Sequence, residues 1–215
     1  MIISLQRRYI FVHIPKTGGT AMALALEKRA ARDDILVGDT PKALARRGRL
    51  KGVQVPGRLW KHATLADIDG LVDLSAMFVF TLVRNPWDRL VSYYHWLRDQ
   101  SFDHVAVSRA KSLDFSGFLN DPGTASSLQS APYASYLTDS AGVMRANLFI
   151  RLEHLATDMA ALTAHLGFVP VMPVANTSTR ARDWRPYYSD KDAATLARIC
   201  AADIAGFNYK FDPEG

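Results

Sequence analysis

Apolar runs of strand length that alternate with helix-forming segments constrain the fold of this chain most. Residues 7–14 (RRYIFVHI) are rich in β-branched and aromatic side chains, and residues 75–84 (SAMFVFTLVR) form a second apolar run. A helix-forming segment follows each run, at 20–32 and at 85–100. Strands that alternate with helices favour an α/β fold with a mostly parallel sheet flanked by helices.

The other segments carry weaker patterns. Residues 146–155 predict a third strand that continues into a helix ending near Gly167, and 189–207 predict a final amphipathic helix. We expect a short helix over 62–72. Glycines and prolines punctuate the basic stretch 32–60, which indicates an irregular surface excursion. At 215 residues and without an internal repeat, the chain is predicted to form a single domain over 1–215.

Composition narrows the function classes. A hydrophobic share of 48% and a charged share of 22% are typical of a soluble globular protein. The net charge of +5 suits an anionic ligand or an acidic polymer, and we expect no nucleic-acid partner. One cysteine, Cys200, excludes an internal disulfide. The longest apolar run, 77–83, is too short to span a bilayer, and the first residues lack the apolar stretch of a signal peptide, so we expect a cytoplasmic protein.

The turn after the first predicted strand has a composition suited to phosphate. In FVHIPKTGGTAM (11–22) the lysine precedes the glycines, whereas a Walker A loop carries its lysine after them. Backbone N–H groups of a glycine-containing turn at a helix N-terminus converge on an anion. The side chains add a mobile charge and two hydroxyls. A tight strand-to-helix turn with an incidental lysine is the alternative for these candidate residues: Lys16, Thr17, Gly18, Gly19 and Thr20.

A second anion-binding set follows the next predicted strand. Arg84 ends the run 75–84, Asn85 and Pro86 are a favourable helix start, and Ser92 lies two turns into the helix. Ligands of open α/β sheets bind at the carboxyl ends of strands, where an arginine fork and a hydroxyl make an anion site. Either residue alone is explained by capping or packing. Two such sites on consecutive strand–helix segments predict a ligand with two separated phosphates.

The two motifs resemble those of a known family. HIPKTGGT (13–20) and RNPWDRLVSYY (84–94) are similar to the 5′-phosphosulfate and 3′-phosphate motifs of sulfotransferases that use 3′-phosphoadenosine 5′-phosphosulfate (PAPS). The lysine–threonine–glycine form resembles the carbohydrate branch, including heparan sulfate 2-O-sulfotransferase and its bacterial relatives. FIRLEHL (149–155), NTSTRARDWRPYYSD (176–190) and DIAGFNYKF (203–211) extend the resemblance over most of the chain.

The resemblance implies a P-loop-like α/β domain that moves the sulfuryl group of PAPS to a hydroxyl of a carbohydrate or similar acceptor. The product would be adenosine 3′,5′-bisphosphate (PAP). It implies that the loop 15–20 holds the 5′-phosphosulfate, with Lys16 stabilising the leaving oxygen. Arg84 and Ser92 would hold the 3′-phosphate, and Ser178 and Arg180 would lie over the nucleotide. The scheme requires no metal, and the sequence shows no convincing metal-ligand spacing.

An acceptor hydroxyl needs a base. KHATLADI (61–68) resembles the segment in which the 2-O-sulfotransferase branch carries a catalytic histidine, which implies that role for His62. A surface histidine that caps the following helix is the alternative. Other sulfotransferases use a glutamate, so Glu27, near the end of the first predicted helix, is the second candidate.

Two other function classes stay open. A P-loop kinase or nucleotide hydrolase is disfavoured because the lysine precedes the glycines, and because Arg84 stands where an acidic Mg²⁺ ligand is expected. A non-catalytic nucleotide-binding module would differ from the enzyme only at Lys16 and His62, and both are present. Residues 32–60 and 101–142 carry no pattern that identifies the acceptor or the oligomeric state.

Overall fold

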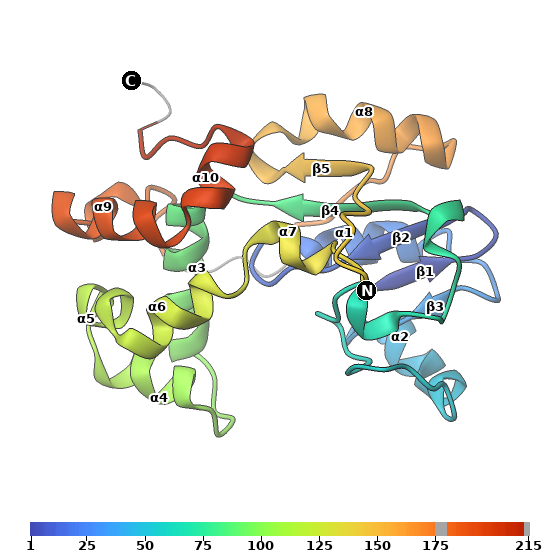
Figure 1. Ribbon diagram of the computed structural model, residues 1–215, viewed down its shortest axis with the longest axis horizontal. Helices are drawn as coiled ribbons and strands as arrows, with labels where there is room; N and C mark the ends of the chain where they lie inside the picture. Colours follow the sequence, from blue (N-terminus) through green and yellow to red (C-terminus); the bar gives the residue numbers. More distant parts are fainter. Residues whose placement is uncertain (175–179, 213–215) are drawn as a thin grey trace. The chain divides into compact units, whose positions relative to one another are not determined.

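The computed structural model describes residues 1–174 and 180–212, and this part of the chain has an α/β fold (Figure 1). The strands of the sheet are β1 (Ile2–Ser4), β2 (Tyr9–Val12), β3 (Ile35–Leu36), β4 (Phe78–Val83) and β5 (Leu148–Arg151).

Helices occupy much of the remaining chain. The α-helices are α1 (Gly19–Glu27), α2 (Pro41–Arg46), α3 (Pro86–Arg98), α4 (Val105–Ser112), α5 (Phe115–Asn120), α6 (Pro122–Gln129), α7 (Tyr133–Tyr136), α8 (Leu155–Leu166), α9 (Asp190–Ile199) and α10 (Ala201–Phe207). Short 3₁₀ helices are η1 (Arg47–Leu50), η2 (Ala66–Ile68), η3 (Leu74–Ala76), η4 (Leu152–His154) and η5 (Arg185–Tyr187). No helix in the described part of the chain is long and apolar enough to cross a membrane.

The sheet has the strand order β3-β1-β2-β4-β5 and is mixed. Strands β2, β4 and β5 are parallel, whereas β1 runs antiparallel to both of its neighbours, β2 and β3. Val12 aligns with Thr81 and Val83 with Arg151, so the carboxyl ends of the three parallel strands lie at one edge. The predicted α/β class is confirmed, and the antiparallel strands β1 and β3 extend the sheet beyond the three predicted ones.

The helix starts follow local capping signals. Asn85 accepts a hydrogen bond from the backbone N–H of Trp87 at 3.1 Å, and Pro86 occupies the first turn of α3, as predicted. The predicted helix before Gly167 is also confirmed, because α8 ends there with a left-handed φ of 72°. The predicted final helix over 189–207 is divided at Cys200 into α9 and α10.

The basic stretch 32–60 is more ordered than its composition predicts. It contains β3, α2 and η1, and Thr40 caps α2 by accepting a hydrogen bond from the N–H of Ala43 at 3.2 Å. The threonine–proline pair before α2 is a helix start of the same kind as the one at α3. The predicted helix over 62–72 is shorter than expected, since only the 3₁₀ helix η2 forms there.

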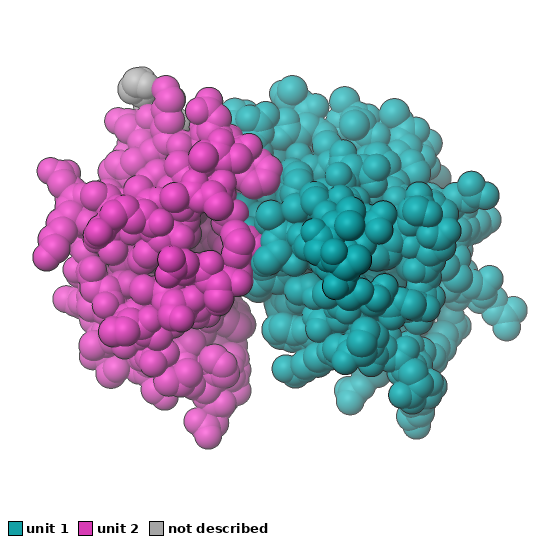
Figure 2. All heavy atoms as spheres, in the orientation of Figure 1, with its two compact units in different colours: residues 1–83, 133–176 teal, residues 84–132, 177–215 magenta. Residues whose placement is uncertain are grey.

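The described chain divides into two compact units, which are coloured separately in Figure 2. Unit 1 comprises 1–83 and 133–176, and unit 2 comprises 84–132 and 177–215. The core of unit 1 is built from one face of the sheet, α1 and α8, with Phe11, Phe80 and Met22 fully buried. The core of unit 2 is built from α3, α4, α5 and α9 around Phe118 and Leu196. A single domain over 1–215 stays a prediction.

Candidate functional site

The loop between β2 and α1 has backbone geometry suited to an anion. Lys16 has a φ of 66° and Gly18 a φ of 86°, both in the left-handed region. Gly18 is the residue before α1, and the first turn of this helix, Gly19 to Met22, carries no carboxylate. A glycine adopts such a φ without strain, whereas a lysine does so at a cost that is typical of functional loops. The partial positive charge of the helix N-terminus therefore faces no acidic residue of its own first turn.

Close packing fixes the shape of this loop. Thr17 is fully buried, and its hydroxyl donates a hydrogen bond to the carbonyl of Ile14 at 2.9 Å. A Cβ on Gly19 would lie 2.0 Å from Cδ2 of His13, so any other residue at this position would force the His13 ring to move. Thr20 is half-buried in the first turn of α1. The hydroxyl of Thr17 is thus used within the loop, and the other predicted loop residues lie together at the start of α1.

His62 is bound to the same loop through a backbone contact. Its Nδ1 lies 2.7 Å from the carbonyl oxygen of His13, and the two imidazole rings meet edge to face at 4.7 Å. A carbonyl oxygen only accepts, so Nδ1 carries the proton and Nε2 keeps its lone pair. Burial lowers the pKa of His62 to about 4, although the hydrogen bond to the His13 carbonyl acts in the opposite direction. The structure therefore holds a neutral imidazole with an unprotonated Nε2 beside the predicted phosphate loop.

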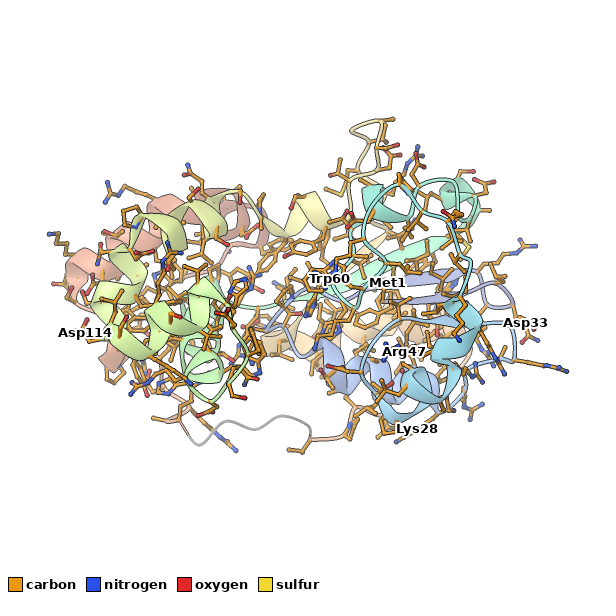
Figure 3. The ribbon with its side chains drawn as sticks, turned by 90° about the horizontal axis from the view of Figure 1, so that it is seen from below. Met1, Lys28, Asp33, Arg47, Trp60 and Asp114 are labelled. Carbon is orange, nitrogen blue, oxygen red and sulfur yellow. The ribbon has the colours of Figure 1, made fainter. Side chains whose placement is uncertain are left out.

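The residues just before His62 in the chain also pack against its ring. Trp60 contacts the His62 ring edge to face at 5.0 Å, and the guanidinium of Arg58 lies 4.7 Å from the centre of the indole ring. Figure 3 shows Trp60 near Met1, whose ammonium donates to the carbonyl of Lys61 at 2.9 Å. Asp67 closes this loop, because its carboxylate accepts from the N–H of Thr64 at 2.8 Å. These contacts fix the orientation of the His62 ring.

Glu27, the second base candidate, has a different environment. It lies at the last position of α1, eight residues after Gly19, which corresponds to about 12 Å along the helix axis. Its carboxylate is buried and accepts a hydrogen bond from the hydroxyl of Thr40 at 2.7 Å. Burial raises the pKa of Glu27. These contacts link the end of α1 to the start of α2. The loop 15–20 lies at the opposite end of α1, away from Glu27.

Unit 2 contains the second predicted set. Arg84 follows β4 directly and forms an ion pair with Asp88, with 2.8 Å from Nε and 2.7 Å from a terminal nitrogen to the same carboxylate oxygen. Arg180 donates to the other oxygen of Asp88. The structure thus brings together the predicted pair Arg84 and Arg180 through a buried aspartate that the sequence analysis did not single out.

The other two predicted residues of this set differ in what can be said of them. Ser92 lies on α3 one turn after Asp88 and is 7% exposed. Ser178 lies outside the described residues. Among the residues that are described, no three His, Cys, Asp or Glu side chains are placed to hold a metal ion.

Sequence reasoning singled out neither Asp88 nor the contact between His13 and His62. His13 stands three residues before Lys16, but its role depends on a contact with His62, 49 positions away. Asp88 had a local signal, because an arginine four residues earlier favours an ion pair on a helix. Its second partner, Arg180, lies 92 positions away, and nothing in the sequence indicates that contact.

Comparisons with known proteins bear on the family and the fold of this chain. The sequence matches the model of the sulfotransferase family over residues 1–210. No curated protein matches the chain. Among solved structures, the crystal structure of mouse sulfotransferase SULT7A1 complexed with PAP has a similar fold, with a TM-score of 0.52 and 17% sequence identity over 96% of this chain and 87% of that one. Because the family model covers nearly the whole sequence, this chain belongs to the sulfotransferase family.

Proposed function

We propose that this sulfotransferase uses PAPS and transfers its sulfuryl group to a hydroxyl of a carbohydrate or similar acceptor, with His62 as the general base. The observation that carries the proposal is the 2.7 Å contact between Nδ1 of His62 and the carbonyl of His13. His13 belongs to the loop with the left-handed Lys16 and Gly18. The proposed base and the proposed phosphosulfate loop are therefore parts of one packed structure within unit 1.

The proposed chemistry is an in-line displacement at sulfur. The acceptor oxygen forms a bond to sulfur while the bond from sulfur to the bridging oxygen of the 5′-phosphate breaks. The acceptor proton moves to Nε2 of His62, which is the ring nitrogen with the lone pair. The ammonium of Lys16 and the N–H groups at the start of α1 stabilise the negative charge that develops on the leaving phosphate. Positioning and charge stabilisation account for most of the catalysis in such a reaction.

Residues of unit 2 are proposed to hold the 3′-phosphate. Arg84 and Arg180 present guanidinium groups, and the carboxylate of Asp88 orients both of them. Ser92 adds a hydroxyl on the same helix. A guanidinium matches phosphate geometry with two parallel N–H donors, so this set favours a nucleotide with a 3′-phosphate over one without it.

A carbohydrate acceptor fits the surroundings of the proposed base. Trp60 is 37% exposed although it contacts His62, so part of an indole ring is open to an incoming molecule. Aromatic rings pack against the apolar faces of ligand rings while polar groups nearby fix the orientation. The indole beside the imidazole supports an acceptor that carries its hydroxyl on a ring.

Titration calorimetry without added metal tests the nucleotide part of this proposal. PAP is expected to bind about 10- to 100-fold more tightly than AMP, because a charge-assisted contact to the 3′-phosphate contributes roughly 1.5–3 kcal/mol. Arg84→Ala should remove most of this preference. Lys111→Ala, an exposed cation on α4, is the matched control and should bind PAP normally. Equal affinity for PAP and AMP contradicts the proposal, and tight binding of ATP that requires Mg²⁺ favours the kinase alternative.

A further inference from the structure

A stripe of polar side chains runs along α3 towards the segment that carries Arg180. Asp88, Ser92 and His95 are spaced by four and three residues, which places them on one face of the helix. Arg180 donates to Asp88 at the start of this stripe, and its charge also acts on His95. Tyr187 of η5 contacts the His95 ring edge to face at 5.2 Å. The segment 180–187 therefore borders the stripe at both ends.

Two ring nitrogens in this region have no hydrogen-bond partner among the described residues. Nε2 of His95 and Nε1 of Trp184 are buried, and neither has a hydrogen-bond partner in the described part of the chain. Buried polar atoms are nearly always satisfied, so such an atom needs an explanation. The His95 nitrogen lies at the end of the Asp88–Ser92–His95 stripe, where the charge of Arg180 acts on it, and a ligand that supplies the missing partner explains it.

The charges of the site define what that ligand is. Arg84 and Arg180 share the carboxylate of Asp88, so these three groups carry a net single positive charge. A phosphate monoester carries close to two negative charges at neutral pH. One further positive charge in the site would therefore balance the charge of the phosphate dianion. His95 is the side chain on this face that can gain a proton near neutral pH.

We propose that His95 binds the 3′-phosphate of the nucleotide through Nε2, beside Arg180 and Ser92, and takes up a proton as the phosphate binds. This inference rests on the proposed function, because it assigns the 3′-phosphate to this face of α3. His95 acts in binding the nucleotide, and it is distinct from His62, the proposed base in unit 1.

The electrostatics of His95 give the direction of the effect. Burial lowers the pKa of His95, the charges of Arg180 and Arg98 lower it further, and Asp99 opposes them. The rings of Tyr94 and Tyr187 also contact the His95 ring edge to face. A phosphate dianion at Nε2 favours the protonated ring and raises the pKa. Protonation and binding therefore promote each other, and the affinity for PAP falls as pH rises through the pKa of the bound state.

Calorimetry in buffers of different ionisation enthalpy measures this coupling directly. At pH 7 and above, where the phosphate is already largely dianionic, wild-type protein is expected to take up protons on binding PAP and to take up none on binding AMP. The affinity for PAP should fall between pH 6.5 and 8.5, by up to about tenfold for each pH unit over which only the PAP-bound form of His95 holds the proton. His95→Gln keeps a neutral donor and should lose both the uptake and the pH dependence, with an affinity about tenfold lower at pH 6.5. His154→Gln, an exposed histidine of unit 1, should behave as wild type.

The outcomes separate this inference from the proposed function. PAP that binds more tightly than AMP without proton uptake, or with equal uptake in His95→Gln, overturns the role of His95 and leaves the proposed function in place. No binding of PAP at any pH overturns both. If His95→Gln does not fold, an NMR titration of the His95 ring in the wild-type protein decides, since the pKa must rise when PAP is added and must not rise with AMP.

Discussion

At the scale of single residues, the contact between His13 and His62 sets which nitrogen of the proposed base carries a proton. A histidine serves as a base only if the ring nitrogen that faces the acceptor lacks a proton. The Nδ1–H of His62 donates a hydrogen bond to the carbonyl of His13, which leaves Nε2 without a proton. Burial lowers the pKa of His62 to about 4, so the ring is neutral. His62 is therefore in its basic form at every pH at which the enzyme is expected to work.

Replacing His62 tests this division of labour. His62→Ala should leave the affinity for PAP nearly unchanged and lower turnover by about 10²- to 10⁴-fold, because it removes only the proton acceptor. In the unmodified protein, the contribution of His62 to turnover should rise as pH increases through about 4 and should be constant above pH 6. Turnover is measured with any acceptor hydroxyl that supports the reaction, and the exposed His165 supplies the control variant, His165→Ala. Near-normal turnover in His62→Ala would remove this residue from the mechanism.

Glu27→Gln completes the comparison. The carboxylate of Glu27 accepts from the Thr40 hydroxyl at 2.7 Å, and glutamine keeps an acceptor oxygen for it, so this variant should fold and its turnover should stay normal. A loss of turnover with unchanged stability would instead make Glu27 the base.

At the scale of secondary-structure elements, the start of α1 depends on the absence of one Cβ. Gly19→Ala should destabilise the protein by about 1–3 kcal/mol, because the new methyl group overlaps the His13 ring. It should also lower turnover, since His13 orients His62. Gly206, inside α10, has no atom within 4 Å of a built Cβ, so Gly206→Ala should stabilise by about 0.4–1 kcal/mol. Denaturant unfolding measures the free energy of unfolding of both variants. A Gly19→Ala variant that is more stable than the wild type would contradict the predicted overlap with the His13 ring.

Elements with strong local signals were predictable from the sequence. The asparagine–proline start of α3 and the glycine after α8 act through neighbouring backbone groups, so their residue types are sufficient. The three-residue β1 and the two-residue β3 were missed because strands this short form only against a neighbour, and their pairing with β2 and with each other is not visible in either segment alone. The candidate site shows the same limit. Lys16 and Arg84 lie in contiguous motifs, whereas the contacts of His13 and Asp88 depend on the fold.

At the scale of the whole molecule, the two proposed phosphate-binding motifs lie in units with separate cores. The loop 13–20 belongs to unit 1, and Arg84, Ser92 and Arg180 belong to unit 2. A ligand that binds only the native state stabilises it by an amount that grows with the ratio of its concentration to its dissociation constant. The thermal stability of the protein therefore reports on which motif a nucleotide engages.

Scanning calorimetry with PAP and AMP uses this relation. PAP at about 100 times its dissociation constant should stabilise the protein by about 2.7 kcal/mol, which for a chain of this length raises Tm by roughly 5–10 °C. AMP at the same concentration should raise Tm less, because it offers no 3′-phosphate to Arg84, and Arg84→Ala should reduce the shift with PAP to that seen with AMP. If the units unfold in separate transitions, AMP should move only the transition of unit 1, since its phosphate suits the loop 13–20, whereas PAP should move both. A shift with PAP that is confined to one unit would show that the two motifs do not bind the two phosphates of one nucleotide.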